Sequence, residues 1–211
     1  YFSEVYGNPS ASHSWGRGAE NAIEAAREQI AQVIGCQPNE IIFTSGGTEG
    51  DNLALRGVGW AMLKRGGKAR LLTTHLEHHA VSVTAKQLAQ TGIGFETVFL
   101  PVDSFGRVDA EQMAATCDAD TLVSLMYANN EIGSVHPLAA LAAQAHERGA
   151  LFHSDAVQAA GQLPLKVAEL GVDLLSVSAH KFYGPKGVGF LFARRGVALI
   201  PSQSGGSHEE G

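Results

Sequence analysis

Residues 41–48 of the chain, with the sequence IIFTSGGT, join a short apolar run to a glycine turn. The run Ile41–Thr44 predicts a short buried strand, because β-branched and aromatic side chains fit a pleated, covered surface. The turn Gly46-Gly47-Thr48 follows, and a helix is expected from about Thr48 to Lys64 before Gly66-Gly67 closes it. A strand that leads through a tight turn into a helix begins a βαβ unit. This stretch therefore favours an α/β fold with a parallel sheet.

Strands and helices alternate along the rest of the chain. Apolar residues at steps of three or four predict a first helix that Gly35 ends, with the inner face Ala19, Ile23, Ala26, Ile30 and Val33. Further strands are expected at Leu71–Thr74, Phe95–Leu100, Thr121–Tyr127, Leu151–Ser154, Leu174–Ser178 and Val188–Phe192. Further helices are expected at Val81–Gln90, after the capping pair Asp109 and Gln112, and after Pro137 with the inner face Leu138, Leu141, Ala142 and Ala145. This order predicts one mainly parallel, doubly wound sheet with helices on both faces.

The composition excludes several classes of function. The chain has 211 residues, a net charge of -6 and 45% hydrophobic content, so it can bury a core but would repel nucleic acid or an anionic membrane. No apolar run approaches the roughly 20 residues of a membrane-spanning helix, and residues 1–4 do not resemble a signal peptide. The two cysteines, Cys36 and Cys117, are expected to be ordinary buried thiols, and they suit a reducing cytoplasm.

Polar clusters follow five of the expected strands. Ligands bind at the carboxyl ends of the strands in such sheets, so these clusters are expected to meet on one edge. In chain order the clusters are Gly46-Gly47-Thr48, Glu77-His78-His79, Asn129-Asn130-Glu131, Asp155 with Gln158, and Ser178-Ala179-His180-Lys181.

Three of these clusters have separate chemical interpretations. Ser45–Thr48 lies at a strand-to-helix turn, which favours an anion such as phosphate but is also compatible with a plain glycine turn. Asp155 could pair with a protonated ring nitrogen or simply cap a helix. Lys181 follows an expected buried strand, where a desolvated amine becomes nucleophilic, although a lysine beside glycines is commonly a solvated loop residue. Together an anion site, a carboxylate and a lysine are what a pyridoxal phosphate (PLP) site needs.

The local motifs then resemble one family. Asn8-Pro9-Ser10 with His13, residues 43–49 (FTSGGTE), residues 129–133 (NNEIG) and residues 178–187 (SAHKFYGPKG) are similar to the cysteine desulfurases of the NifS/IscS branch. That family belongs to the class V, fold-type I PLP enzymes, and the resemblance implies the large PLP-binding domain of that fold. The paired His78-His79 is closer to the SufS branch.

The resemblance implies a role for each site residue. Lys181 would be the Schiff-base lysine and would later move the substrate's Cα proton. His78 would stack on the cofactor ring, and Asp155 would bind the ring nitrogen. Gln158 would contact the phenolic oxygen, and Asn130 the substrate carboxylate or the cofactor face. The phosphate would be held by Gly47, Thr48, Ser178 and His180, and no metal is expected.

The resemblance also implies an activity and partners. The parent enzyme would be a cytoplasmic homodimer that takes sulfur from L-cysteine, leaving L-alanine and an enzyme persulfide for a sulfur-acceptor or iron–sulfur scaffold protein. Family chains are roughly twice this long, so residues 1–211 are expected to be an incomplete large domain. The nucleophilic cysteine and the arginine for the substrate carboxylate lie further along in the family, so these 211 residues alone are expected to be inactive. Departures from the family are Gly50-Asp51, where Ser-Asn is expected, and Tyr127, where histidine is common.

Three other functions remain open from the sequence. A metal-dependent hydrolase could use His78, His79, His153 and Asp155, although no zinc-binding spacing is recognised. Another class V enzyme is possible, such as a selenocysteine lyase, a kynureninase-like hydrolase or a small aminotransferase. A truncated domain could also bind PLP or a partner without catalysis.

Overall fold

The computed structural model describes Tyr1 and residues 3–205, and within these residues one seven-stranded sheet organises the fold. The strands are β1 (Ile41–Thr44), β2 (Ala69–Thr74), β3 (Phe95–Leu100), β4 (Thr121–Ser124), β5 (Leu151–Asp155), β6 (Leu174–Ser178) and β7 (Gly189–Ala193). Their order across the sheet is β1-β7-β6-β5-β4-β2-β3. Neighbouring strands from β6 to β3 are parallel, and only β7 is antiparallel to both of its neighbours. The mainly parallel sheet is therefore confirmed.

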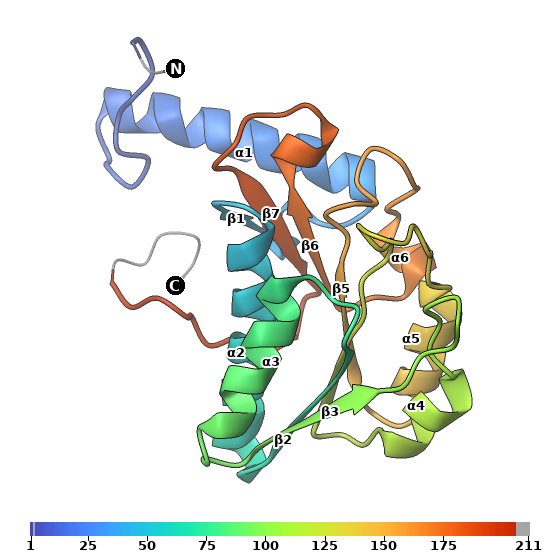
Figure 1. The fold of residues 1–211 in the computed structure, drawn as a ribbon. Helices are drawn as coiled ribbons and strands as arrows, with labels where there is room; N and C mark the ends of the chain where they lie inside the picture. Colours follow the sequence, from blue (N-terminus) through green and yellow to red (C-terminus); the bar gives the residue numbers. More distant parts are fainter. Residues whose placement is uncertain (2, 206–211) are drawn as a thin grey trace.

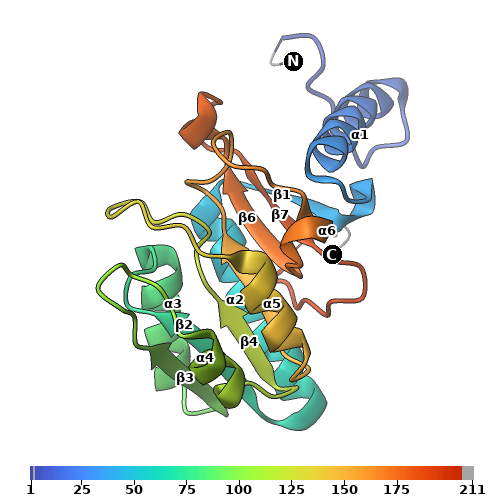
Figure 2. The same ribbon diagram turned by 90° about the vertical axis from the view of Figure 1, so that its right-hand side faces the viewer.

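Helices cover both faces of this sheet. Those described are α1 (Ser14–Ile34), α2 (Gly47–Gly66), α3 (His79–Gln90), α4 (Ala110–Thr116), α5 (Leu138–His146) and α6 (Val167–Leu170), with short 3₁₀ turns η1 (Pro38–Glu40) and η2 (Ala179–Phe182). Helices α2 and α3 lie on one face, and α4, α5 and α6 lie on the other (Figures 1 and 2). The doubly wound arrangement is thus also confirmed. None of the described helices is both long enough and apolar enough to cross a membrane.

The side chains of the central strands alternate between two cores. Leu122 of β4, Leu174 of β6 and Leu191 of β7 pack beneath α2 and α3, whereas the next residue of each strand belongs to the other core. This period of two is the pleat of a strand that is buried on both faces. The predicted inner face of α5 is correct, because Leu138, Leu141, Ala142 and Ala145 are all buried.

The end of one strand and one residue of a helix face differ from the sequence-based prediction. β4 ends at Ser124 rather than Tyr127. The backbone N–H groups of Leu125 and Tyr127 still bond to β5, but that of Met126 donates to the Glu77 side chain at 3.1 Å, so the pairing with β2 stops. In α1, the buried residue near the end is Ile34, and Val33 is 69% exposed. A step of four residues keeps Ile30 and Ile34 on one face, whereas a step of three rotates Val33 away.

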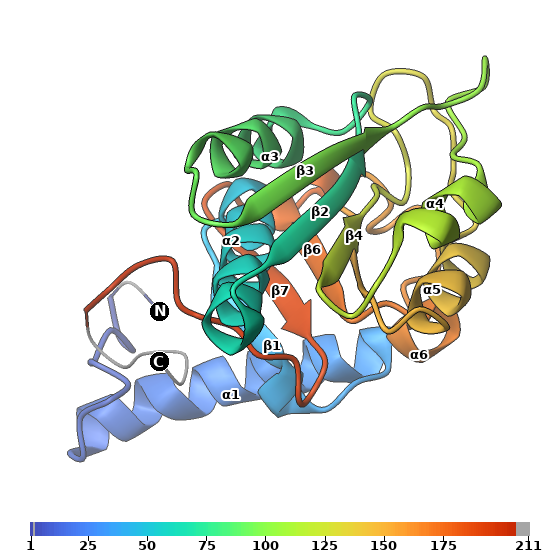
Figure 3. The same cartoon turned by 90° about the horizontal axis from the view of Figure 1, so that it is seen from below.

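The strand directions bring the five polar clusters to one edge, the upper edge in Figure 1. β1 runs in the same direction as β6, because both are antiparallel to β7. Cys36 and Cys117 precede β1 and β4, so they lie at the opposite, amino edge, as Figure 3 allows the reader to follow. Both thiols are half-buried rather than fully buried, and burial, with the negative charge of Glu40 and of Asp118 respectively, raises each pKa to about 11.

Phe152 provides a test of the core between the sheet and α5. This side chain is fully buried, so Phe152→Ala should lower the free energy of unfolding by about 3–5 kcal/mol through lost burial and the cavity that remains. Phe105, which is 67% exposed, is the matched control, and Phe105→Ala should change stability by less than about 0.5 kcal/mol. Equal losses for the two variants in urea denaturation would contradict this packing.

Candidate active site

The turn between β1 and α2 forms an anion-binding geometry from backbone groups. Gly46 caps α2 without any side-chain hydrogen bond, and its φ of 149° is accessible to glycine but not readily to other residues. A Cβ at Gly47 would lie 2.5 Å from Cγ2 of Val157, so no larger residue fits there without movement. Because the first N–H groups of a helix have no intrahelical acceptor, those of Gly47 and Thr48 can bind an oxyanion.

Ser178 joins this turn from the neighbouring part of the sheet. Its side chain is buried at the end of β6, and a Cβ at Gly46 would lie 3.2 Å from its Oγ. Ser178 Oγ is 2.8 Å from Nδ1 of His180, and this contact ties the exposed His180 ring to the same corner. The four residues expected to hold a phosphate, Gly47, Thr48, Ser178 and His180, thus come together from two strand ends.

Asp155 forms the centre of a second group, which contains the expected ring partners. The carboxyl is 5% exposed at the end of β5, and Oδ1 accepts the N–H of Val157 at 2.8 Å. Burial raises the pKa of Asp155, while the Val157 hydrogen bond and the nearby charges of His78 and Lys181 oppose that rise. The side chains of His78 and Asp155, together with Asp51, place one polar atom each within 4.8 Å of one another. His78 and Asp155 therefore share one small volume, and Lys181 is near enough for its charge to act on Asp155.

The outer members of the site are exposed or half-buried, and Lys181 is more exposed than expected. Lys181 lies on η2 with an exposed side chain, so the burial that we expected for its amine is absent from this structure. The reason is local: β6 is buried to Ser178, but the chain then leaves the sheet through η2, and Tyr183 at φ 67° ends that turn. Gln158 is half-buried in the turn after Asp155, and Asn130 is exposed in the turn after β4.

Glu77 and Asn129 belong to this site although neither has a role predicted from the sequence. Glu77 is buried, and its Oε1 accepts hydrogen bonds from the Met126 N–H at 3.1 Å and the Thr74 hydroxyl at 3.3 Å. Burial raises the pKa of Glu77 to about 8, with the charge of Asp155 adding to the rise. Asn129 fixes the next loop through its Oδ1, which accepts from the N–H groups of Glu131 and Ile132. Their position after strands was the available signal, but it does not distinguish them from their exposed neighbours His78 and Asn130.

His153 does not support the metal-dependent alternative. Its ring is fully buried, with Nδ1 2.8 Å from Ser124 Oγ and Nε2 3.0 Å from Ser176 Oγ. Burial lowers the pKa of His153 to about 3, so the ring is neutral and both nitrogens are engaged by hydroxyl groups. His79 is exposed, with its ring centroid 6.2 Å from that of His78. The four expected ligands therefore do not converge.

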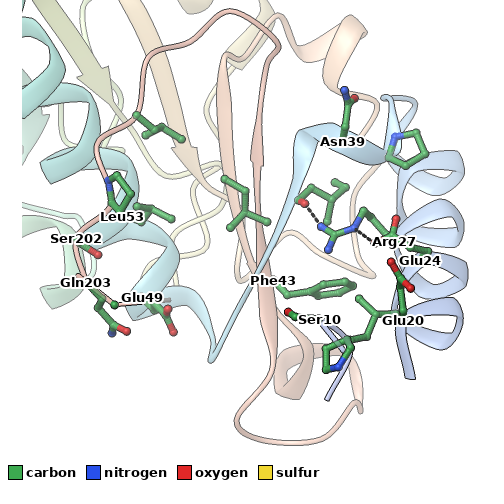
Figure 4. A pocket seen from close by; sticks show the side chains of 18 of the residues that line it. Ser10, Glu20, Glu24, Arg27, Asn39, Phe43, Glu49, Leu53, Ser202 and Gln203 are labelled. Atoms are coloured by element: carbon green, nitrogen blue, oxygen red, sulfur yellow. Dashed lines mark hydrogen bonds and ion pairs between the residues drawn. The ribbon is translucent and has the colours of Figure 1, made fainter. Parts of the chain in front are cut away.

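A cavity of about 940 Å³ lies elsewhere, between α1, the edge strand β1 and the segment 197–205 (Figure 4). Arg27 reaches into its wall, where it donates to the Ile41 carbonyl and pairs with Glu24 at 3.1 Å. The carboxylates of Glu20 and Glu49 also line the cavity. This acidic lining disfavours a phosphate, so the strand-end cluster remains the better candidate for the PLP site.

Comparison with known proteins agrees with this geometry. The profile of the family described as aminotransferase class-V matches residues 1–210. Over 210 residues the chain is 49% identical to the cysteine desulfurase IscS of Dictyoglomus turgidum, which covers 99% of this chain and 52% of that protein. A solved structure of a NifS-like protein matches with a TM-score of 0.92 and 42% identity. The match covers 100% of this chain and 57% of the chain of the NifS-like protein. A structure described as SspA in complex with cysteine has a TM-score of 0.91 at 38% identity, over 99% and 60% of the two chains.

The chain belongs to the class-V aminotransferase family, whose members are PLP-dependent enzymes. The names of its relatives confirm the resemblance to the IscS/NifS cysteine desulfurases, and the NifS-like structure confirms the expected fold type. The chain spans about half the length of the curated relatives it matches.

Glu77 should make the free energy of unfolding fall as pH rises. Its pKa is raised from 4.5 to about 8, so between these values the folded state holds a proton that the unfolded state has lost. Rising pH should therefore destabilise the protein by about 1.4 kcal/mol per pH unit across that window through this group. Glu77→Gln removes the effect, and its stability relative to the wild type should rise as pH increases.

The measurement is urea denaturation at several pH values, with Glu28→Gln on the exposed side of α1 as the control. If the free energies of unfolding of the wild type and of Glu77→Gln changed in parallel with pH across this range, the raised pKa of Glu77 would be contradicted.

Proposed function

We propose that the protein containing this chain is a PLP-dependent cysteine desulfurase, which converts L-cysteine to L-alanine and an enzyme-bound persulfide. The observation that carries the proposal is the convergence of Lys181, Asp155 and the Gly46-Gly47 turn at one edge of the sheet. The 49% identity to a cysteine desulfurase selects this reaction among those of class V.

The residues present fit PLP. The glycine turn excludes a Cβ where a phosphate needs backbone N–H groups, and Asp155 is an acceptor for a protonated ring nitrogen. PLP, when bound, supplies an aldehyde that condenses with a primary amine and a ring that withdraws electrons. Lys181 would supply that amine and later accept the substrate's Cα proton. His78 would cover the ring, Gln158 would bind its phenolic oxygen, and Asn130 would contact the cofactor face or the substrate carboxylate.

The sulfur-accepting thiolate must be a group other than the two cysteines of this chain. Cys36 and Cys117 lie at the amino edge of the sheet, across the fold from Lys181. Their pKa values of about 11 keep both as thiols near neutral pH, whereas sulfur attack requires a thiolate. The expectation that residues 1–211 alone release no sulfide stays a prediction.

The proposal extends to partners and compartment. The substrate is L-cysteine, which is supported by the similar structure of SspA in complex with cysteine. The whole protein would act as a homodimer in the cytoplasm and would pass sulfur to an iron–sulfur scaffold or another acceptor protein, in line with the IscS name of its relatives.

Lys181 is the first residue to test. Borohydride treatment of the PLP-loaded protein should attach the cofactor irreversibly to Lys181, as found by peptide mass spectrometry, because the reduced carbon–nitrogen bond cannot hydrolyse. Lys186, five positions further along the same exposed loop, is the matched control. Lys181→Ala should abolish the labelling and Lys186→Ala should retain it. Label on Lys186, or on scattered lysines, would refute the role of Lys181.

Gly47 tests the phosphate site. A Cβ there would lie 2.5 Å from Val157, so Gly47→Ala must displace the turn that presents the N–H groups. Losing one hydrogen bond to a charged phosphate should weaken PLP binding by about tenfold or more. Gly18→Ala in α1 is the control, because its Cβ would meet only Val5 at 3.8 Å. Equal PLP affinities of Gly47→Ala and the wild type in a fluorescence titration would rule out this cradle.

A further inference from the structure

Asp51 is a buried acid that the proposed reaction does not yet use. It lies in the second turn of α2, is 1% exposed, and reaches the group formed by His78 and Asp155 within 4.8 Å. α2 approaches the sheet this closely because glycine occupies position 50, where a Cβ would lie 3.1 Å from Ser176 Oγ. The carboxyl groups of Asp51 and Asp155 each place an oxygen within 4.8 Å of the other, and their interaction raises the pKa of Asp51 and opposes the rise in the pKa of Asp155. A hydrogen bond between two carboxyls requires a proton on one of them.

The charges around the pair decide which carboxyl holds the proton. Asp155 accepts the N–H of Val157 and interacts with the side chains of His78 and Lys181, and all three oppose the rise in the pKa of Asp155. His78 lies within 4.8 Å of both carboxyls, but within the part of the chain that the structure describes no backbone N–H and no lysine or arginine opposes the rise in the pKa of Asp51. Its neighbours include Asp155 and Glu77, whose negative charges raise its pKa further above the value that burial alone would give.

His153 of β5 and Ser176 of β6 also face Asp51. Nε2 of His153 is 3.6 Å from Asp51 Oδ1, but the ring is neutral and bonds to Ser176 and Ser124. Ser176 also bonds to Asp51, so the hydroxyl of Ser176 can donate to Asp51 while it accepts from His153. Asp51 Oδ1 has no hydrogen-bond partner within the part of the chain that the structure describes. A neutral Asp51 needs no counter-charge there.

We propose that Asp51 is a positioning residue, a neutral carboxylic acid that donates its proton in a hydrogen bond to Asp155 and thereby holds Asp155 as the ionised partner of the cofactor's ring nitrogen. The inference rests on the proposed PLP function. The hydrogen bond stabilises a carboxylate that is otherwise desolvated, and it fixes the orientation of the oxygen left for the ring. An ionised Asp51 would instead repel Asp155 across a few ångströms of protein interior.

The first experiment uses the protein without cofactor, so it does not depend on PLP. Infrared spectra at neutral pH should contain the carbonyl stretch of a protonated carboxyl that disappears in Asp51→Asn. Glu77→Gln is the control for the other buried acid and should remove a different band, because Glu77 also has a raised pKa. A difference spectrum between wild type and Asp51→Asn without a protonated carboxyl band would overturn the proposal.

Stability supplies a second cofactor-free measurement. The pKa of Asp51 is raised well above 3.8, so above that pH the folded state holds a proton that the unfolded state lacks, and stability falls as pH rises. The melting temperature of Asp51→Asn relative to the wild type should therefore rise with pH. A constant or falling difference would overturn the proposal.

The last measurement adds PLP and separates this inference from the proposed function. Asp51→Asn keeps a neutral donor, so its PLP affinity and the pH titration of its PLP absorbance should match the wild type. Asp51→Ala removes the donor and should shift that titration and weaken PLP binding by about tenfold, with Asp51→Asn as the rescuing variant. Asp155→Asn should disturb the absorbance more strongly. If Asp155→Asn changes nothing, the proposed function fails; if only Asp51→Ala changes nothing, the role of Asp51 alone fails.

Discussion

The close approach of the first two turns of α2 to the ends of β5 and β6 is the contact on which the rest of the site depends. A Cβ at Gly47 would overlap Val157, and a Cβ at Gly46 or Gly50 would lie within 3.2 Å of Ser178 or Ser176, tighter than an ordinary contact. Close packing of backbone against side chains brings the free N–H groups of the helix start directly over the strand ends. The same approach carries Asp51 into the interior beside Asp155, so the anion site and the carboxyl pair have one structural cause.

The layer beneath this contact is polar although it is buried. Ser124, His153 and Ser176 form a hydrogen-bonded row across three neighbouring strands, and Asp51 and Glu77 flank it. Buried ionised groups without a counter-charge are strongly disfavoured, so this row is stable only if the histidine and the acids on its protein side are neutral. The depressed pKa of His153 and the raised pKa of Glu77 follow from that single constraint.

Much of this arrangement was predictable from the sequence, because the relevant patterns are local. Strand–turn–helix order placed five polar clusters on one edge, and strand direction then required them to meet. Val33 was misplaced because steps of three and four both fit a helical face, and only packing distinguishes them. The end of β4 depended on Glu77, whose carboxyl replaces β2 as the acceptor for Met126. The burial of Asp51 and the exposure of Lys181 both depend on tertiary contacts that no local pattern encodes.

The charge of the site therefore changes with depth, from the solvent to the protein interior. The side chains of His78 and Lys181 are exposed, the buried Asp155 interacts with both, and the acids behind it, Asp51 and Glu77, have raised pKa values. In the proposed site, a ring nitrogen that enters from solvent would meet an anion stabilised from behind by hydrogen bonds rather than by a fixed cation. A buried cation at position 51 would have neutralised Asp155 and competed with the ring for it. A protonated acid stabilises the same anion without that competition, because its hydrogen bond occupies one lone pair and leaves the net charge in place.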